Sequence, residues 1–223
     1  MTTAIIVAAG SSSRMGFDKL LARLGDAPVI LHTLRAFQVC PDIDSFIVVA
    51  APERAEVIER LSDDEGFTKL RGFISGGEAR HHSVNAGLEA LPDDCDFVAV
   101  HDGARPLIHP QQISRCIARA RECGAAACAR PLVETLKRAD SGGLVTGSVD
   151  REGLWIMETP QVFSRTLLTE AYAAVLRDGA AVTDEVSAVE RAGYPVHLVS
   201  NPFPNLKITW PEDLAIAERL LPS

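Results

Sequence analysis

The clearest indication of the architecture is a stretch near the amino terminus, Ile5-Ile6-Val7-Ala8-Ala9-Gly10-Ser11-Ser12-Ser13-Arg14-Met15-Gly16-Phe17-Asp18-Lys19. Its first five residues, 5–9, are all apolar, which is typical of a parallel strand buried on both faces. The Gly- and Ser-rich segment 10–16 then predicts a loop at the carboxyl end of that strand, where open parallel sheets bind their ligands. We therefore expect an α/β domain with a binding site that begins at this loop.

Short apolar runs alternate with longer helical patterns along most of the chain. Further strands are predicted at residues 46–50, 72–75, 97–100, 125–131 and 196–200. Helices are predicted at residues 29–39, 52–61, 83–91, 111–122, 165–176, 184–192 and 211–221. This alternation predicts a Rossmann-like, mostly parallel sheet with helices on both faces, in a single domain that spans residues 1–223.

The alternation is interrupted at about residues 134–156. Residues 135–138 and 144–146 flank the turn Ser141-Gly142-Gly143, and this pattern predicts a β-hairpin with no intervening helix. A hairpin that projects from an α/β domain needs a cover for its strand edges, and a second copy of the chain is the cover we expect. The sequence therefore predicts a homodimer joined through this β-arm.

Composition limits the classes of partner. The 223 residues carry a formal net charge of −8, which opposes any bulk attraction to nucleic acid or to an anionic membrane surface. No apolar run approaches the ~20 residues of a membrane span, and no basic segment of a signal peptide precedes the first strand. The five cysteines form no Cys-x-x-Cys motif, which favours reduced thiols and a cytoplasmic location.

Two glycine-containing loops carry the first polar motifs. Residues 8–19 combine the open backbone around Gly10 with Arg14 and Lys19, a combination that suits phosphate oxygens. Residues 76–83, Gly76-Gly77-Glu78-Ala79-Arg80-His81-His82-Ser83, place a glycine pair just before a predicted helix, where backbone N–H groups can face an anion.

Two further motifs add a carboxylate and more cations. Asp102 follows a predicted strand and is a candidate Mg²⁺ ligand, because Mg²⁺ prefers one or two carboxylates together with phosphate oxygens and water. Arg105 adds a planar fork suited to phosphate. Lys207 lies in a run, 205–209, that we expect to be β-like. The chain has only four lysines among its 22 basic residues, and three of them fall in such motifs, where a compact point charge is useful.

Taken together and in this order, these motifs resemble those of the 2-C-methyl-D-erythritol 4-phosphate cytidylyltransferase family of the non-mevalonate isoprenoid pathway. The resemblance covers essentially the whole chain. It is carried by residues 8–19, 101–106, 134–138, 149–155, 159–161, 183–185 and 205–209.

The resemblance implies a fold of the nucleotide-diphospho-sugar transferase type, with a β-arm that clasps a second subunit. It implies transfer of CMP from CTP to the polyol phosphate, with release of pyrophosphate. Arg14 and Lys19 match cations on the CTP phosphates, Lys207 matches a cation at the α-phosphate, and Asp102 matches a Mg²⁺ ligand. The cytidine pocket matches Ala8, Ala9, Gly10, Gly77, Glu78 and Ser83. The polyol-phosphate site matches Arg105, Thr135 and Arg151, the last two from the partner's arm.

Two departures from the family pattern accompany the resemblance. Residues 11–13 are all serine, where relatives often have more glycine. Residues 201–205 contain no acid before the Asn-x-Lys segment, so the second metal-facing group is not identified.

Other functions fit part of the pattern. Ribitol 5-phosphate cytidylyltransferases have a similar layout, and molybdenum-cofactor nucleotidyltransferases share the first loop, although the arm and residues 159–161 favour the methylerythritol enzymes over the latter. A non-catalytic nucleotide sensor is disfavoured because the cations and Asp102 are retained. A nicotinamide-dependent dehydrogenase is disfavoured because the first loop lacks further glycines at Rossmann spacing.

Overall fold

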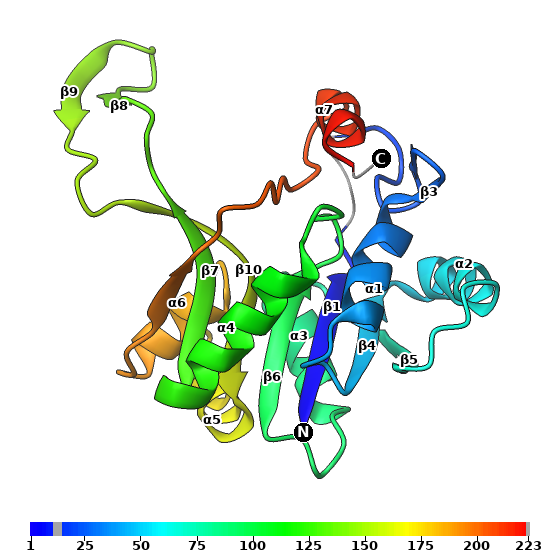
Figure 1. The fold of residues 1–223 in the computed structure, drawn as a ribbon. Helices are drawn as coiled ribbons and strands as arrows, with labels where there is room; N and C mark the ends of the chain where they lie inside the picture. Colours follow the sequence, from blue (N-terminus) through cyan, green and yellow to red (C-terminus); the bar gives the residue numbers. More distant parts are fainter. Residues whose placement is uncertain (11–14, 222–223) are drawn as a thin grey trace.

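The computed structural model describes residues 1–10 and 15–221. Its main sheet is formed by β1 (Thr2–Ala8), β4 (Ser45–Ala50), β5 (Leu70–Ser75), β6 (Phe97–Asp102), β7 (Ala125–Pro131), β10 (Trp155–Ser164) and β11 (His197–Ser200). The strand order is β11-β7-β10-β6-β1-β4-β5 (Figure 1). Strand β10 runs antiparallel to β6 and β7, whereas the remaining neighbours pair in parallel. The predicted α/β class with a mostly parallel sheet is confirmed.

Helices cover both faces of this sheet. One face packs against α1 (Val29–Val39), α2 (Pro52–Asp63) and α4 (Pro110–Cys123), and the other packs against α3 (Arg80–Glu89), α5 (Arg165–Arg177) and α6 (Glu185–Arg191). The last helix, α7 (Glu212–Leu220), lies beside the short pair β2 (Arg23–Leu24) and β3 (Ala27–Pro28). Within the described ranges, none of these helices is both long enough and apolar enough to cross a membrane.

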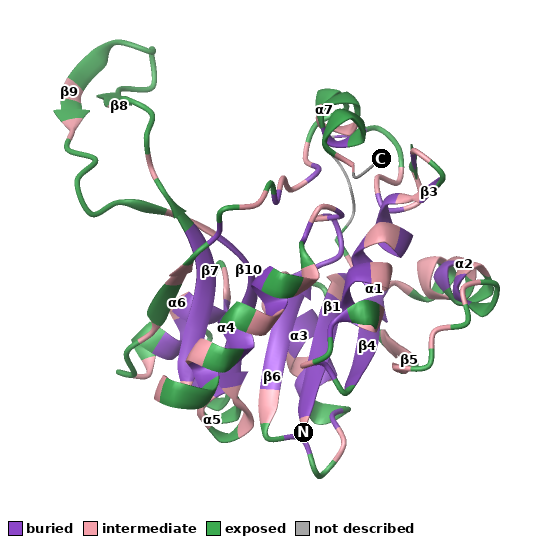
Figure 2. Ribbon diagram, viewed as in Figure 1, coloured by how far each residue is buried: buried purple, intermediate pink, exposed green. Residues whose placement is uncertain are grey.

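The apolar run of the first strand is explained by burial on both sides. Ala4, Ile6 and Ala8 of β1 belong to the core under α1, α2 and α4. Ile5, which points to the opposite face, belongs to the core under α3, α5 and α6. Figure 2 shows the resulting continuous band of buried strands through the centre of the molecule. A strand that is buried on both faces cannot alternate apolar with polar residues, and the sequence of β1 does not.

Strand β10 was not predicted from the sequence. Its central residues Glu158, Thr159 and Gln161 are polar, and Pro160 cannot donate a backbone hydrogen bond, so the segment lacks the usual pattern of a central strand. The structure accommodates the proline at a register shift between Met157 and Gln161, where the Thr159–Pro160 peptide bond is cis. These polar residues lie in the middle of the sheet and line a cavity of the site described below, which is why they are not apolar.

The predicted β-like run at 205–209 is wrong. These residues form no strand among the described parts of the chain. The backbone N–H of Ile208 donates to the carbonyl of Ala104 at 2.8 Å, so the segment runs beside the loop after β6 without joining the edge of the sheet.

The predicted hairpin is present as β8 (Leu136–Ala139) and β9 (Val145–Val149), which pair with each other in a separate two-stranded sheet. It extends well away from the body of the molecule (Figure 1). Its apolar side chains are uncovered: Val133, Leu144 and Val145 are 67%, 70% and 59% exposed. An exposed apolar hairpin is a surface that a partner can bury.

Replacement of Phe37 tests the packing of α1 on the sheet. Phe37 is fully buried, and its ring centroid lies 5.0 Å from that of His101. We expect Phe37→Ala to lower the free energy of unfolding by about 3–5 kcal/mol, because it leaves a cavity in the core. In the same helix Val39 is 65% exposed, so Val39→Ala should change that free energy by less than about 0.5 kcal/mol. Urea denaturation measures both, and equal losses would contradict the observed packing.

Candidate active site

The site lies where the order of the strands reverses. From β1 the chain steps outward to β4 and β5, and α3 then carries it back across the sheet to β6, on the other side of β1. The carboxyl ends of β1 and β6 therefore flank a crevice, the position at which open α/β sheets bind ligands. Ala8 ends β1 at this crevice, Ala9 and Gly10 follow it, and Asp102 ends β6 there.

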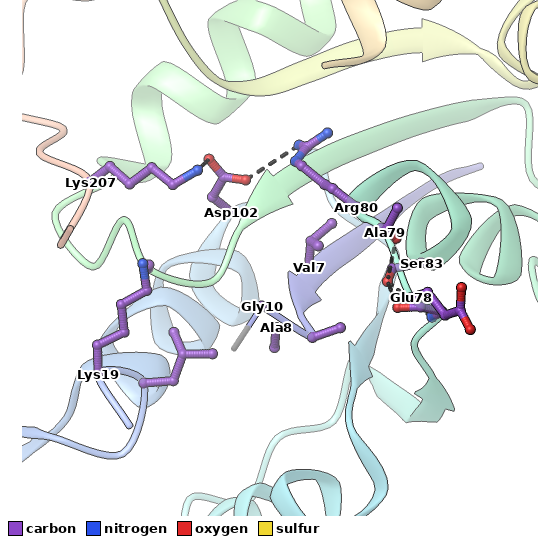
Figure 3. A pocket seen from close by; sticks show the side chains of 14 residues that line it. Val7, Ala8, Gly10, Lys19, Glu78, Ala79, Arg80, Ser83, Asp102 and Lys207 are labelled. Atoms are coloured by element: carbon purple, nitrogen blue, oxygen red, sulfur yellow. Dashed lines mark hydrogen bonds and ion pairs between the residues drawn. The ribbon is translucent and has the colours of Figure 1, made fainter. Parts of the chain in front are cut away.

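The first of two cavities opens at this crevice and has a volume of about 360 Å³ (Figure 3). All six residues predicted for the cytidine pocket line it: Ala8, Ala9, Gly10, Gly77, Glu78 and Ser83. Three of the predicted charged residues line it too, namely Lys19, Asp102 and Lys207. Arg14 lies outside the described residues. The sequence thus identified the walls of one real cavity from segments far apart in the chain.

Glycines allow two loops to meet at the wall of the first cavity. A Cβ atom added to Gly76 would lie 2.4 Å from the Cβ of Ala9, a distance that only glycine avoids. The Ser83 hydroxyl accepts a hydrogen bond from the backbone N–H of Gly77 at 3.1 Å and lies 3.2 Å from the carbonyl of Ala79. Ser83 therefore shapes the loop before α3 as well as lining the cavity.

The second cavity has a volume of about 550 Å³ and adjoins the first. The two cavities share Arg80, Asp102 and Lys207 as common lining residues. Beyond this boundary the second cavity is lined by Arg105 and by polar side chains from β10 and the start of α6, among them Glu158, Thr159, Gln161, Asp184 and Ser187. Two compartments that meet at a cluster of cations can hold two anionic molecules in contact.

Asp102 is the centre of that cluster. Its carboxylate lies 2.8 Å from Lys207 Nζ and 3.3 Å from Arg80 Nη2 (Figure 3). Arg105 Nε lies 3.4 Å away. Burial would raise the pKa of Asp102, but Lys207, Arg80 and Arg105 outweigh it and hold that pKa below its usual range. Asp102 is therefore a carboxylate, not a carboxylic acid, throughout the physiological pH range.

His101 supports Asp102 from inside the sheet. Burial lowers the pKa of His101 to about 3, so the ring is neutral at physiological pH. The Thr159 hydroxyl accepts from the backbone N–H of Asp102 at 3.1 Å and lies 3.0 Å from Nδ1 of His101. Nε2 of His101 lies 3.4 Å from the carbonyl oxygen of Arg105, which can only accept, so the ring proton is assigned to Nε2 and Nδ1 accepts from the Thr159 hydroxyl. A neutral, fully buried histidine with this role cannot relay protons to a ligand.

Lys19 and Arg105 also form hydrogen bonds with the backbone of residues 205–208, the segment that carries Lys207. Lys19 Nζ donates to the carbonyl of Ile208 at 2.8 Å. Arg105 Nη1 donates to the carbonyl of Asn205 at 2.8 Å. These bonds tie Lys19, which lines the first cavity, and Arg105, which lines the second, to the segment of Lys207, which lines both.

Thr135 and Arg151 are not brought to this site within one chain. Thr135 lies next to β8, and the guanidinium of Arg151 donates to the carbonyl of Val133 at the base of the arm. Neither residue lines either cavity in the described part of the structure. In a single copy the predicted polyol-phosphate site is therefore represented only by Arg105.

Sequence reasoning missed the role of Arg80. The predicted helix began at residue 83, which left Arg80 in a loop, whereas α3 begins at Arg80 and aims its guanidinium between the cavities. Its partner Glu185 was noted only as part of the motif 183–185. The only available signal was the motif 183–185 at the start of a predicted helix, which contains two acids. Nothing in the sequence pairs Glu185 with Arg80, which is 105 residues away.

Glu158 is the second acidic residue that the sequence did not assign. It is 5% exposed and lines the second cavity. Its Oε2 accepts from the side-chain amides of Asn201 at 2.8 Å and Asn205 at 3.0 Å. The segment 201–205 lacks an acid of its own, and its two asparagines instead hold this carboxylate from β10.

Comparisons with known proteins identify one enzyme family. The family model described as 2-C-methyl-D-erythritol 4-phosphate cytidylyltransferase matches residues 2–223. A protein of that name from Dehalococcoides mccartyi is 43% identical over 219 residues, which are 98% of this chain and 95% of that protein. A crystal structure of 4-diphosphocytidyl-2C-methyl-D-erythritol synthase from Anaerococcus prevotii has a TM-score of 0.86 at 28% identity, covering 98% and 95% of the two chains.

A longer relative shares the same region. The bifunctional enzyme IspD/IspF of Desulforudis audaxviator is 44% identical over 227 residues, and this chain spans 56% of its length. The crevice at the reversal of strand order and the names of the relatives together define the class: an α/β nucleotidyltransferase that uses CTP. The chain belongs to the 2-C-methyl-D-erythritol 4-phosphate cytidylyltransferase family.

Proposed function

We propose that this chain transfers CMP from CTP to 2-C-methyl-D-erythritol 4-phosphate and releases pyrophosphate. The observation that supports this most directly is the boundary shared by the two cavities, where Asp102, Arg80 and Lys207 face both. CTP would occupy the first cavity, with its base near Gly77 and Ser83. The acceptor would occupy the second, with its phosphate near Arg105 and Lys207.

The reaction needs positioning more than it needs a base. A phosphate oxygen of the acceptor attacks the α-phosphorus of CTP, and the bond from that phosphorus to the pyrophosphate oxygen breaks. A phosphate monoester is largely ionised at pH 7, because its second pKa is about 6, so no residue has to remove a proton from it. The neutral, buried His101 agrees with such a site. Bringing two anions together is the main barrier, and Arg14, Lys19 and Lys207 would lower it.

A divalent cation fits the chemistry of Asp102. The described residues contain no cluster of three carboxylate, histidine or cysteine ligands. Mg²⁺ is nevertheless commonly bound by one or two carboxylates, with phosphate oxygens and water as its remaining ligands. Asp102, an ionised carboxylate that faces both cavities, fits that requirement. When bound, Mg²⁺ would neutralise charge on the nucleotide phosphates. Asp102 would hold it through one carboxylate oxygen. Lys207 and Arg105 would keep their contacts with the other oxygen, Oδ2, and would also face the acceptor phosphate.

We further propose that two copies of the chain complete each other's second cavity. The exposed apolar hairpin supports this, as does the position of Thr135 and Arg151 on the arm, away from their own cavities. In a homodimer these two residues would reach the acceptor site of the partner. A cytoplasmic location accords with the cysteines, all of which are free thiols.

The proposed activity is tested by pyrophosphate release from CTP and Mg²⁺ with either 2-C-methyl-D-erythritol 4-phosphate or ribitol 5-phosphate. We expect turnover with the methylerythritol substrate and its loss when EDTA removes the metal. Turnover with ribitol 5-phosphate alone would retain the reaction class and contradict the proposed acceptor. No turnover with either acceptor would contradict the reaction itself.

Lys19 is expected to act on the charge that develops at the phosphates. Lys19→Ala should lower kcat by ~10²-fold or more, the usual loss when one preorganised donor is removed. Lys69→Ala is the matched control, because the Lys69 ammonium bonds to the carbonyl of Cys40 away from both cavities. Steady-state rates at saturating CTP measure both variants. A loss below about threefold for Lys19→Ala would contradict this role.

Mixing of variants tests whether the site is shared. Arg151→Ala should mainly raise KM for the acceptor phosphate, because the proposed role of Arg151 is to bind that phosphate in the partner's site. A dimer of one Lys19→Ala subunit and one Arg151→Ala subunit would contain one site with both residues intact. Mixing the two variants, with subunit exchange, should therefore restore activity at low acceptor concentration. Exchange without any recovery would show that each chain uses its own Arg151.

A further inference from the structure

A buried ion pair lies directly behind the boundary of the two cavities. Arg80 Nη1 and Nη2 lie 2.5 and 3.0 Å from Oε1 and Oε2 of Glu185, an arrangement in which both oxygens are engaged. Glu185 is fully buried, and the hydroxyl of Tyr172, itself 1% exposed, donates to Oε1 at 2.9 Å. The pair joins the first turn of α3 to the first turn of α6, with Tyr172 reaching it from α5.

Burial makes this pair difficult to break. A buried carboxylate that loses its counter-charge is strongly destabilised, so Glu185 holds the guanidinium in place. Burial lowers the pKa of Arg80, but Glu185 and Asp102 outweigh it and raise that pKa above its usual range. The two short bonds to Glu185 fix the position of the guanidinium, and from that position it reaches Asp102 at only 3.3 Å.

The contact between Arg80 and Asp102 is correspondingly weak. Arg80 Nη2 lies 3.3 Å from Oδ1 of Asp102, beyond the usual length of a charge-assisted hydrogen bond. The other oxygen, Oδ2, is closer to its main partner, Lys207, at 2.8 Å and is also approached by Arg105 at 3.4 Å. Among the described residues, Oδ1 has no hydrogen-bond partner other than Arg80. It is the more weakly held of the two carboxylate oxygens.

We propose that Glu185 and Tyr172 restrain Arg80 from forming a full ion pair with Asp102, which keeps Oδ1 of Asp102 available to the divalent cation that accompanies CTP. Arg80, Glu185 and Tyr172 are positioning residues in this arrangement, because they act through Asp102. The inference rests on the proposed function, since it assumes that Asp102 is the metal ligand.

Removal of the charge on Glu185 has a definite consequence. In Glu185→Gln the guanidinium of Arg80 keeps a neutral neighbour but loses its counter-charge. The nearest carboxylate is then Asp102, and a planar guanidinium readily forms two parallel bonds to a carboxylate. Arg80 would then compete with the cation for Oδ1. Tyr172→Phe removes one hydrogen bond to Glu185 and leaves its charge, so it should act in the same direction more weakly.

The experiment measures Mn²⁺ binding, without turnover, in the presence of a non-hydrolysable α,β-methylene analogue of CTP. The electron paramagnetic resonance signal of free Mn²⁺ gives the dissociation constant. We expect Glu185→Gln to raise that constant by about tenfold, the loss typical of residues that orient a metal ligand. Affinity for the analogue without metal should be unchanged. A smaller rise is expected for Tyr172→Phe.

The matched control is a second, similarly paired arginine and glutamate. Arg35 contacts Glu65 through two bonds of 2.7 and 2.6 Å, and neither residue lines the two cavities. Glu65→Gln should leave Mn²⁺ binding unchanged. Circular dichroism and thermal unfolding establish that each variant is folded, and Tyr172→Phe decides the question if Glu185→Gln does not fold.

The outcomes separate this inference from the proposed function. Unchanged or tighter Mn²⁺ binding by a folded Glu185→Gln variant, with normal binding by the wild type, would overturn the positioning role and leave the function intact. An equal loss in Glu65→Gln would also overturn it. A wild type that turns over CTP but does not bind Mn²⁺ with the analogue would refute both the metal assignment of Asp102 and this inference.

Discussion

The arrangement of the site depends on one buried carboxylate that stays ionised. Asp102 ends a central strand and is 7% exposed, so its charge is tolerated only with cations close to it. Those cations come from α3, from the loop after β6 and from the segment after β11, at positions 80, 105 and 207. One charge requirement thus fixes three otherwise independent segments around the same point, which is also where the two cavities meet.

Global charge and local charge have opposite signs in this molecule. The chain carries a net charge of −8, yet the boundary of the cavities gathers arginine and lysine side chains around Asp102. An anionic ligand would therefore depend on short-range contacts with these side chains, because the field of the whole protein opposes it. The second cavity also has acidic side chains, among them Glu158, so Arg80, Arg105 and Lys207 are the lining residues there that suit an anion.

The sequence predicted the parts of the fold whose residues serve only the core. Strand β1 and helix α1 have apolar patterns that burial alone explains, and both were predicted close to their observed bounds. Strand β10 was missed because residues 158–161 serve the site, so their polarity and proline hide the strand. The two loops of the first cavity were predicted from glycine and charge, and their individual pocket residues from the family resemblance. The pairing of Arg80 with Glu185 was not, because local patterns carry no information about a contact between distant segments.

Residues 205–209, which carry Lys207, form no strand, and two cations that line the cavities hold this segment instead. Lys19 and Arg105 donate to the backbone carbonyls of Ile208 and Asn205. Each of these side chains has further N–H donors, so one cation can hold the segment and face its cavity at the same time. The segment is therefore held by the same groups that give the cavities their positive charge.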